Sequence, residues 1–187
     1  IIIAGVGVYL YNSIDSIVKN AIERSGTEIT GTKVSVGSVD ISLRSGHGTI
    51  RDVRVKTPDG FSGNDALTLG EITIDLDVSS LNRDPIVIQE IRVNAPVVNA
   101  EVDELLKTNV GVIRSHVQGY QVSKAPAEPG KQDAGYEKHF VIRSFVMNEG
   151  VVRGDATRVG SEKREHELPP VELSNVGRRA ITLVLRV

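Results

Sequence analysis

The chain has 187 residues, the length of one typical domain, and its 40% hydrophobic and 25% charged content is ordinary for a protein that folds around a core. Its 22 basic and 24 acidic residues give a formal net charge of −2, and 4% of the residues are aromatic, so the composition excludes a strongly basic or base-stacking nucleic-acid binder. The sequence contains no cysteine, which excludes disulfides, thiolate metal sites and cysteine nucleophiles.

Residues 1–11 form an uncharged, mostly apolar run that does not begin with Met. The run is too short to span a bilayer, which takes about 20 apolar residues, so we expect it to be the outer end of a longer N-terminal transmembrane helix. Tyr9 and Tyr11 would then lie at the membrane interface. A cleaved signal peptide and a buried soluble helix are the alternatives. The anchoring residues in this interpretation are Ile1, Ile2, Ile3, Val6, Val8 and Leu10.

The helical pattern continues beyond the apolar run, and Gly26 is expected to end it. We therefore predict that residues 1–12 end a transmembrane helix, that 13–26 form an amphipathic helix, and that 27–187 form a folded module. The residues after the apolar run have mixed charge and no Lys/Arg cluster, which favours a folded module outside the cytoplasm, in the periplasm.

The chain after the helix has the alternation of apolar and polar residues that is typical of strands. Turn signals at Ser45-Gly46, Pro58-Asp59-Gly60 and residues 82–85 separate the strands, and this spacing predicts β-hairpins in a meander rather than βαβ units. Two apolar sets each change phase once, as a β-bulge would cause. They are Val34, Val36, Val39, Ile41 and Leu43, and Leu67, Leu69, Ile72, Ile74 and Leu76.

A degenerate repeat occurs three times, at residues 50–58, 88–96 and 142–150. Its pattern is apolar-x-x-apolar-x-apolar-x-x-Pro/Gly, and the second and third copies extend in register over 86–98 and 140–152. The apolar-x-x-apolar step predicts a phase change within each strand, and the final Pro or Gly predicts the end of the strand.

The segment between the last two copies has two parts. Residues 103–120 carry an apolar stripe at helical spacing with acidic residues in the first turn, which predicts a helix packed on the sheet. Residues 123–138 are rich in Pro, Gly and polar residues, which predicts a mobile linker. Near the end of the chain, residues 181–185 form a further apolar segment that fits a strand or a helix.

Several segments together resemble AsmA-like proteins of the bacterial envelope, in particular the small, single-module members. The resemblance implies an inner-membrane anchor, a curved β-sheet with an apolar concave face, and contact with phospholipid. Besides the N-terminal apolar run, it rests on residues 29–39 (ITGTKVSVGSV), 46–50 (GHGTI), 59–62 (DGFS), 69–72 (LGEI), 84–88 (DPIVI) and 168–177 (LPPVELSNVG).

Signals for catalysis or metal binding are missing from the sequence. It has no phosphate-binding loop, no His-Glu-x-x-His and no Gly-x-Ser-x-Gly motif, and its four histidines are scattered. Asp75 and Asp77 share a strand face, but Ca²⁺ needs six to eight oxygen ligands, so we interpret them as solvated side chains. The mixed charges of residues 162–165 are interpreted as a solvated turn. We expect no enzyme activity, no cofactor and no metal.

The expected fold is mainly β, with an N-terminal transmembrane helix followed by a curved, twisted antiparallel sheet and one packed helix. The expected function is non-enzymatic contact with phospholipid, or help in its transport, through an apolar β-groove of an inner-membrane protein. The alternative is a structural or assembly subunit that docks on a larger membrane complex, so the expected partners are the membrane, phospholipid and other envelope proteins. The candidate groove residues are Val53, Val55, Ile91, Val93, Phe145 and Met147.

Overall fold

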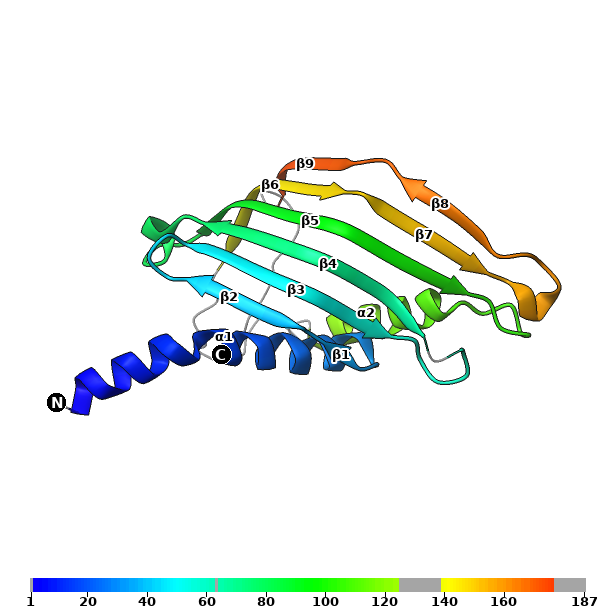
Figure 1. Ribbon diagram of the computed structural model, residues 1–187, viewed down its shortest axis with the longest axis horizontal. Helices are drawn as coiled ribbons and strands as arrows, with labels where there is room; N and C mark the ends of the chain where they lie inside the picture. Colours follow the sequence, from blue (N-terminus) through cyan, green and yellow to red (C-terminus); the bar gives the residue numbers. More distant parts are fainter. Residues whose placement is uncertain (1, 63, 125–138, 177–187) are drawn as a thin grey trace.

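The computed structural model describes residues 2–62, 64–124 and 139–176, and Figure 1 shows one extended sheet with helices along its lower side. In chain order its elements are α1 (Ile2–Thr30), β1 (Val34–Ser35), β2 (Ser38–Ser42), β3 (His47–Lys56), β4 (Asp65–Leu76), the 3-10 turn η1 (Val78–Ser80), β5 (Ile86–Glu101), α2 (Asn109–Lys124), β6 (Phe140–Asn148), β7 (Gly150–Asp155), the 3-10 turn η2 (Thr157–Val159), β8 (Arg164–Leu168) and β9 (Val171–Val176).

The nine strands form one open sheet of mixed direction. Three pairs of short strands lie end to end, namely β1 with β2, β6 with β7, and β8 with β9. Counting each such pair as one strand line, the sheet has six strand lines, in the order β1/β2, β3, β4, β5, β6/β7 and β8/β9. The strands from β2 to β5 pair antiparallel, as the predicted meander requires. β5 pairs parallel with β6 and β7, and this corrects the expectation of an antiparallel sheet without βαβ units. Parallel neighbours need a long crossover, and the segment that contains α2 supplies it.

The second and third repeat copies lie side by side in this parallel pair. Ile86 is opposite Phe140 and Val97 is opposite Val151, which is the register of the sequence repeat. The backbone irregularities also match, because Ala95 (φ 50°) and Glu149 (φ 55°) occupy equivalent positions with positive φ. The long match between the two copies therefore corresponds to two neighbouring strand lines of the same shape.

An aligned line of bulges crosses the whole sheet: each strand line has an extra residue at the same level, so the pairing register does not shift across the line. The face that carries the core is called the inner face below. At one level of the sheet, two residues separate successive inward positions in every strand line, so the strands change phase together. The breaks between β1 and β2, β6 and β7, and β8 and β9 fall on this line. The inward pairs that flank it are Val36/Val39, Ile50/Val53, Leu69/Ile72, Val93/Pro96, Met147/Gly150 and Leu168/Val171.

This line confirms the phase changes predicted within both apolar sets and the first repeat copy. A second irregularity at Gln89, where the β4–β5 register shifts, accounts for the apolar-x-x-apolar step of the second copy. The expected strand end at Pro or Gly holds for Pro58, which follows β3, and is wrong for Pro96, which lies within β5. Proline is tolerated there because a bulge needs no ladder donor.

α1 runs without a break from Ile2 to Thr30, so the expected stop at Gly26 is wrong. A Cβ on Gly26 would lie 3.1 Å from Val34 Cγ1, which shows that this glycine lets the helix approach β1 closely. The helix ends before Gly31, whose φ of +68° favours glycine. α1 covers both the predicted membrane segment and the amphipathic segment that was predicted to continue from it. Within the described residues, no helix combines the length and apolar character needed to cross a membrane.

A polar stripe of α1 holds the first edge of the sheet. Asp15 Oδ1 accepts from Ile41 N (2.9 Å), Glu23 Oε1 from Val36 N (2.8 Å) and Thr27 Oγ1 from Val34 N (3.0 Å), and Lys19 Nζ donates to Gly37 O (3.0 Å). These four side chains recur every fourth residue, so they lie on one helix face. They occupy backbone groups that an edge strand would otherwise expose.

α2 begins at Asn109, not at the predicted residue 103. Thr108 Oγ1 accepts from Gly111 N (3.0 Å) and caps the helix, whereas the carboxylate of Asp103 accepts from amides of the preceding loop. Asn109 is fully buried and ties the helix to β5, with Oδ1 accepting from Glu101 N (2.8 Å) and Nδ2 donating to Asn99 O (2.7 Å). The predicted linker overlaps the end of α2 at 123–124; its remaining residues, and the apolar segment 181–185, lie outside the described residues.

The core lies at the corner between α1, α2 and the first strands. Val18 and Ile22 of α1 and Ile113 of α2 pack against a buried cluster from β1, β2, β3 and the residues between them. The members of this cluster are Val34, Val36, Val39, Ile50, Val53 and Val55. Because both helices contribute to one cluster, their contact fixes where they lie on the sheet.

We predict that Gly31→Ala destabilises the fold through this contact. The positive φ costs an alanine about 1–2 kcal/mol, and the new Cβ would lie 2.6 Å from the His116 ring of α2. Chemical unfolding monitored by circular dichroism measures the loss. Combining Gly31→Ala with His116→Ala should recover only the part of the lost stability that comes from the clash with the ring. The matched control is Gly119→Ala, whose Cβ meets nothing within 4 Å in α2 and which should stabilise the helix by about 0.5–1 kcal/mol. Equal stability of Gly31→Ala and the unmodified chain would contradict the described contact.

Candidate functional site

The two faces of the sheet differ sharply in chemistry. Directly paired residues project to the same side, so the register defines rows that run across the strands. Two neighbouring rows of the inner face are apolar from the first strand line to the last, apart from Gly48. They are Val39, Ile50, Ile72, Val93, Met147 and Val171, and Ile41, Gly48, Ile74, Ile91, Phe145 and Leu173.

The structure places all six predicted groove residues on this inner face. Ile91 is directly paired with Phe145, and Val93 with Met147. Their burial differs, however. Val53 and Val55 are 7% exposed and belong to the core cluster under the helices, and Val93 is also buried, whereas Ile91, Phe145 and Met147 are half-buried.

The helices cover one part of the inner face and leave another part accessible. α1 packs on β1 and β2, and α2 packs on α1 and β5. Exposure rises toward the last strand line, where Leu173 is 48% exposed. We call this accessible part the open apolar face, and within the described residues it comprises Ile88, Ile91, Ile142, Phe145, Met147, Val171 and Leu173.

Four of these residues were missing from the sequence-based set. Ile88 and Ile142 open the second and third repeat copies, and the register pairs them directly. Val171 and Leu173 alternate with polar residues in β9 and continue the two apolar rows. The alternation after Pro170 is visible in the sequence, and it could have identified both.

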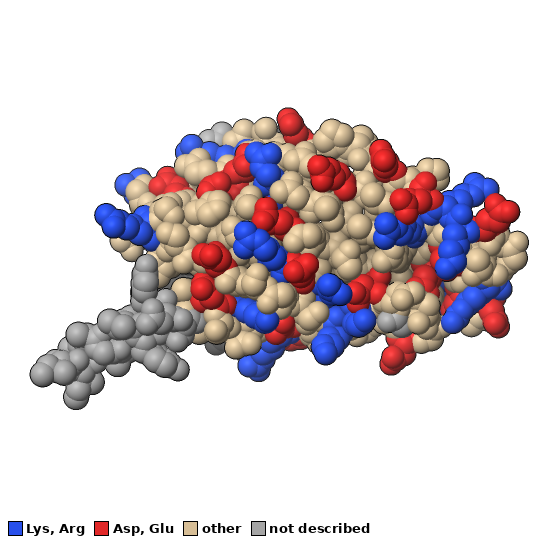
Figure 2. Space-filling model, viewed as in Figure 1, with Lys and Arg blue, Asp and Glu red and all other residues tan. Residues whose placement is uncertain are grey.

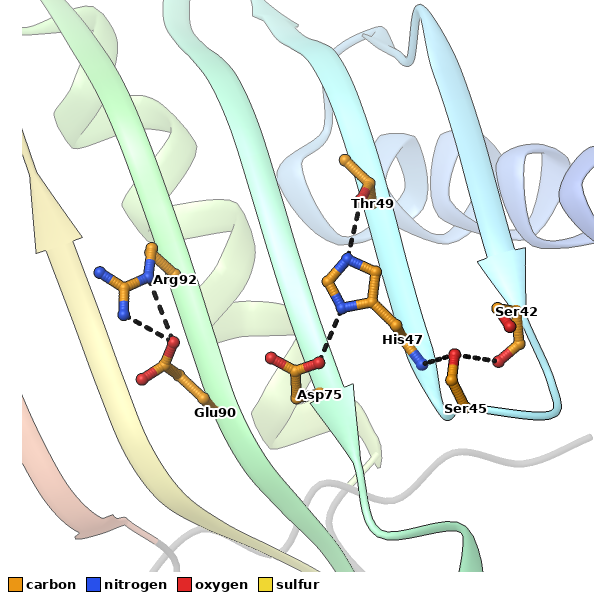
Figure 3. A network of polar contacts seen from close by, with 7 residues as sticks. All are labelled: Ser42, Ser45, His47, Thr49, Asp75, Glu90 and Arg92. Atoms are coloured by element: carbon orange, nitrogen blue, oxygen red, sulfur yellow. Dashed lines mark hydrogen bonds and ion pairs between the residues drawn. The ribbon is translucent and has the colours of Figure 1, made fainter.

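The opposite, outer face carries exposed ion pairs, between neighbouring strands for His47–Asp75 and within β5 for Arg92–Glu90. His47 Nδ1 lies 2.7 Å from Asp75 Oδ1, and Arg92 Nη2 lies 2.8 Å from Glu90 Oε1 (Figure 3). Both members of the His47–Asp75 pair are about half exposed. Figure 2 shows basic and acidic side chains interspersed over the face in view. Exposed pairs of this kind contribute little to stability, about 0–1 kcal/mol each.

Asp75 and Asp77 have separate local roles. Asp75 pairs with His47, while Asp77 caps η1, where the Ser79 hydroxyl donates to its carboxylate (2.7 Å) and lowers its pKa. His139 lies 2.8 Å from the Asp84 carboxylate on the surface. Among the described residues, no group of three or more His, Cys, Asp or Glu could hold a metal ion.

A polar hollow of about 470 Å³ lies at the end of the sheet formed by β4, β5, β7 and β8. Ion pairs join its walls, with Lys163 Nζ 2.9 Å from Asp155 Oδ2 and Arg153 Nε 2.6 Å from Glu165 Oε2. The Thr157 hydroxyl and then Lys163 lower the pKa of Asp155 to about 2. Residues 162–165 are therefore not simply a solvated turn, because Arg164 begins β8 and two of them form these pairs.

No known protein family, curated protein or solved structure matches this chain. The chemistry and accessibility of the open apolar face are the features of the described residues that bear on function.

Proposed function

We propose that this protein is a non-enzymatic, membrane-anchored envelope protein that contacts phospholipid acyl chains through the open apolar face. The observation that carries the proposal is that the apolar rows continue across the whole inner face to β6 and β9, whereas the described helices pack mainly on β1, β2 and the end of β5. An apolar surface that stays accessible to solvent marks a site of interaction.

The size of the face fits an acyl chain. The longest stretch of the open apolar face in one strand runs from Ile142 to Met147 of β6 and is about 17 Å long at about 3.3 Å per residue. One acyl chain occupies half of a hydrocarbon core that is about 30 Å thick, so it needs about 15 Å. Each methylene that leaves water contributes about 0.8 kcal/mol, which makes a partly covered acyl chain a favourable ligand.

The proposed location is the bacterial inner membrane, with the folded module in the periplasm. The uncharged run at residues 1–11 and the resemblance to AsmA-like proteins support it. A docking subunit of a larger membrane complex would bury the same face against protein instead of lipid.

Leu173→Asp should reduce phospholipid binding. The substitution places a charge within the open apolar face at a residue that is 48% exposed, so the fold should tolerate it while acyl-chain contact is lost. Native mass spectrometry of the detergent-purified full chain measures the bound phospholipid. The adjacent Ser174→Asp is the control, because Ser174 pairs with Ser144 on the outer face and should keep the lipid.

Two results would overturn the proposal. One is equal phospholipid in the unmodified chain and Leu173→Asp when circular dichroism shows both folded. The other is a stoichiometric protein partner, in place of lipid, that Leu173→Asp releases and Ser174→Asp retains, which would favour the docking subunit.

The anchor predicts that the full-length protein stays with membranes during alkaline extraction. Lys at both Val6 and Val8 should release it, because each charge costs about 2.5–3.5 kcal/mol near the centre of a membrane helix and less near its end. Fractionation followed by immunoblotting measures the retention. Ser13→Lys is the control, since this position lies beyond the apolar run. Retention of the double variant, or release of the unmodified protein by salt, would refute the anchor.

A further inference from the structure

A short loop at the far end of β5 exposes two neighbouring leucines. Leu105 is 76% exposed and Leu106 is 74% exposed, the largest exposures among the large hydrophobic residues that the structure describes. The loop lies between Val102 and Thr108, which pair as an isolated β-bridge. We call residues 103–107 the leucine tip.

Hydrogen bonds hold the leucine tip in a defined conformation. Asp103 Oδ1 accepts from Leu105 N (2.9 Å) and Lys107 N (2.8 Å), Asp103 N donates to Lys107 O (2.9 Å), and Leu106 N donates to Asp103 O (3.0 Å). These four hydrogen bonds fold the loop around one carboxylate and its own backbone. The apolar side chains take no part in them and are presented outward.

Leu106 adopts a backbone conformation that disfavours leucine. Its φ is +62°, a region that glycine enters freely and that bulky residues rarely occupy. Nothing in the loop's hydrogen bonds needs a leucine side chain, so glycine would satisfy the backbone better. The fold therefore holds an exposed apolar residue in a strained conformation at a cost to stability, which indicates that Leu106 has a role other than folding.

The leucine tip also continues the apolar side of β5. The inward positions of this strand after the bulge line are Pro96, Val98 and Ala100, and the chain then passes through Val102 into the tip. At the first turn of α2, Val110 is 37% exposed. The apolar inward positions of β5 therefore lead along the chain toward the two leucines.

We propose that the leucine tip inserts into the surface of a lipid bilayer. Two leucines are too small for a stable protein interface, which buries about 1,200 Å² or more with shaped, aromatic-rich hot spots. A bilayer needs no complementary pocket, because affinity scales with the apolar area that enters it. Glu104 and Lys107 flank the leucines and are both exposed, so the Lys107 ammonium group can reach the headgroups while the Glu104 carboxylate stays in water. This contact is separate from the open apolar face and does not require that face to bind lipid.

The absence of cysteine allows a direct test with one environment-sensitive label. Leu105→Cys, labelled with bimane in the full chain, is reconstituted in vesicles of phosphatidylethanolamine and phosphatidylglycerol that contain brominated acyl chains. Insertion predicts a blue shift and a loss of fluorescence to bromine. Asp59→Cys is the matched control: it is exposed in the turn between β3 and β4, at the same end of the sheet as the leucine tip but outside it, and should not be quenched.

A second substitution distinguishes insertion of the leucine tip into the bilayer from mere proximity of the label to it. Leu106→Asp in the labelled Leu105→Cys chain should abolish the quenching, while Leu106→Gly should weaken it and raise the melting temperature by relieving the positive φ. Absent quenching with phospholipid still bound to the open apolar face would overturn this proposal and leave the proposed function intact. Quenching that survives Leu106→Asp, or self-association in detergent that Leu106→Asp abolishes, would also overturn it, the latter in favour of a contact between copies.

Discussion

The aligned line of bulges is the constraint on which the rest of the structure depends. Side chains alternate along a strand, so an extra residue in one strand alone would turn the remainder of that strand inside out relative to its neighbours. Here every strand line changes phase at the same level, and the apolar rows on both sides of the line stay on one face. The chain accepts positive φ at Asp52, Ala95 and Glu149 for this alignment, at about 1–3 kcal/mol each. A continuous apolar face and a separate polar face are the result.

The position of α1 determines how much of that face stays accessible. Its polar stripe bonds to the backbone of the first strand line, from Asp15 near one end to Thr27 near the other. A helix held in this way lies along the edge of the sheet and cannot also lie across β6 and β9. The same contacts therefore protect one edge from pairing with other chains and leave the far half of the inner face accessible. The proposed lipid contact follows from the geometry of an edge-bound helix.

The sequence predicts the local features better than the long-range ones. The bulges were predictable because an apolar-x-x-apolar step is a local signal, and the turns before β3 and β4 were predictable for the same reason. The parallel pairing of β5 with β6 was not, because a degenerate repeat indicates similar strands without indicating that they are neighbours. The polar stripe of α1 looks like a solvated helix face, and only tertiary structure shows that it bonds to a strand edge. Asp103 resembles the first turn of a helix, but loop amides compete for its carboxylate. Of the candidate site, the strand face was predictable and its coverage was not, because coverage depends on where both helices lie.

The measurement that tests this account most directly is cysteine accessibility along β5 across the bulge line, in the otherwise cysteine-free full chain, with and without phospholipid. Single cysteines at Val93 and Val98 should resist a water-soluble maleimide, while cysteines at Arg92, Asn94 and Val97 should react with and without phospholipid. A cysteine at Ile91, in the open apolar face, should react without phospholipid and become protected when phospholipid is bound. This pattern changes phase between positions 93 and 98, as a bulge at Ala95 requires. Uninterrupted alternation, with Val97 protected and Val98 reactive, would contradict the aligned bulges, and labelling at Ile91 that phospholipid leaves unchanged would contradict the lipid-contacting face.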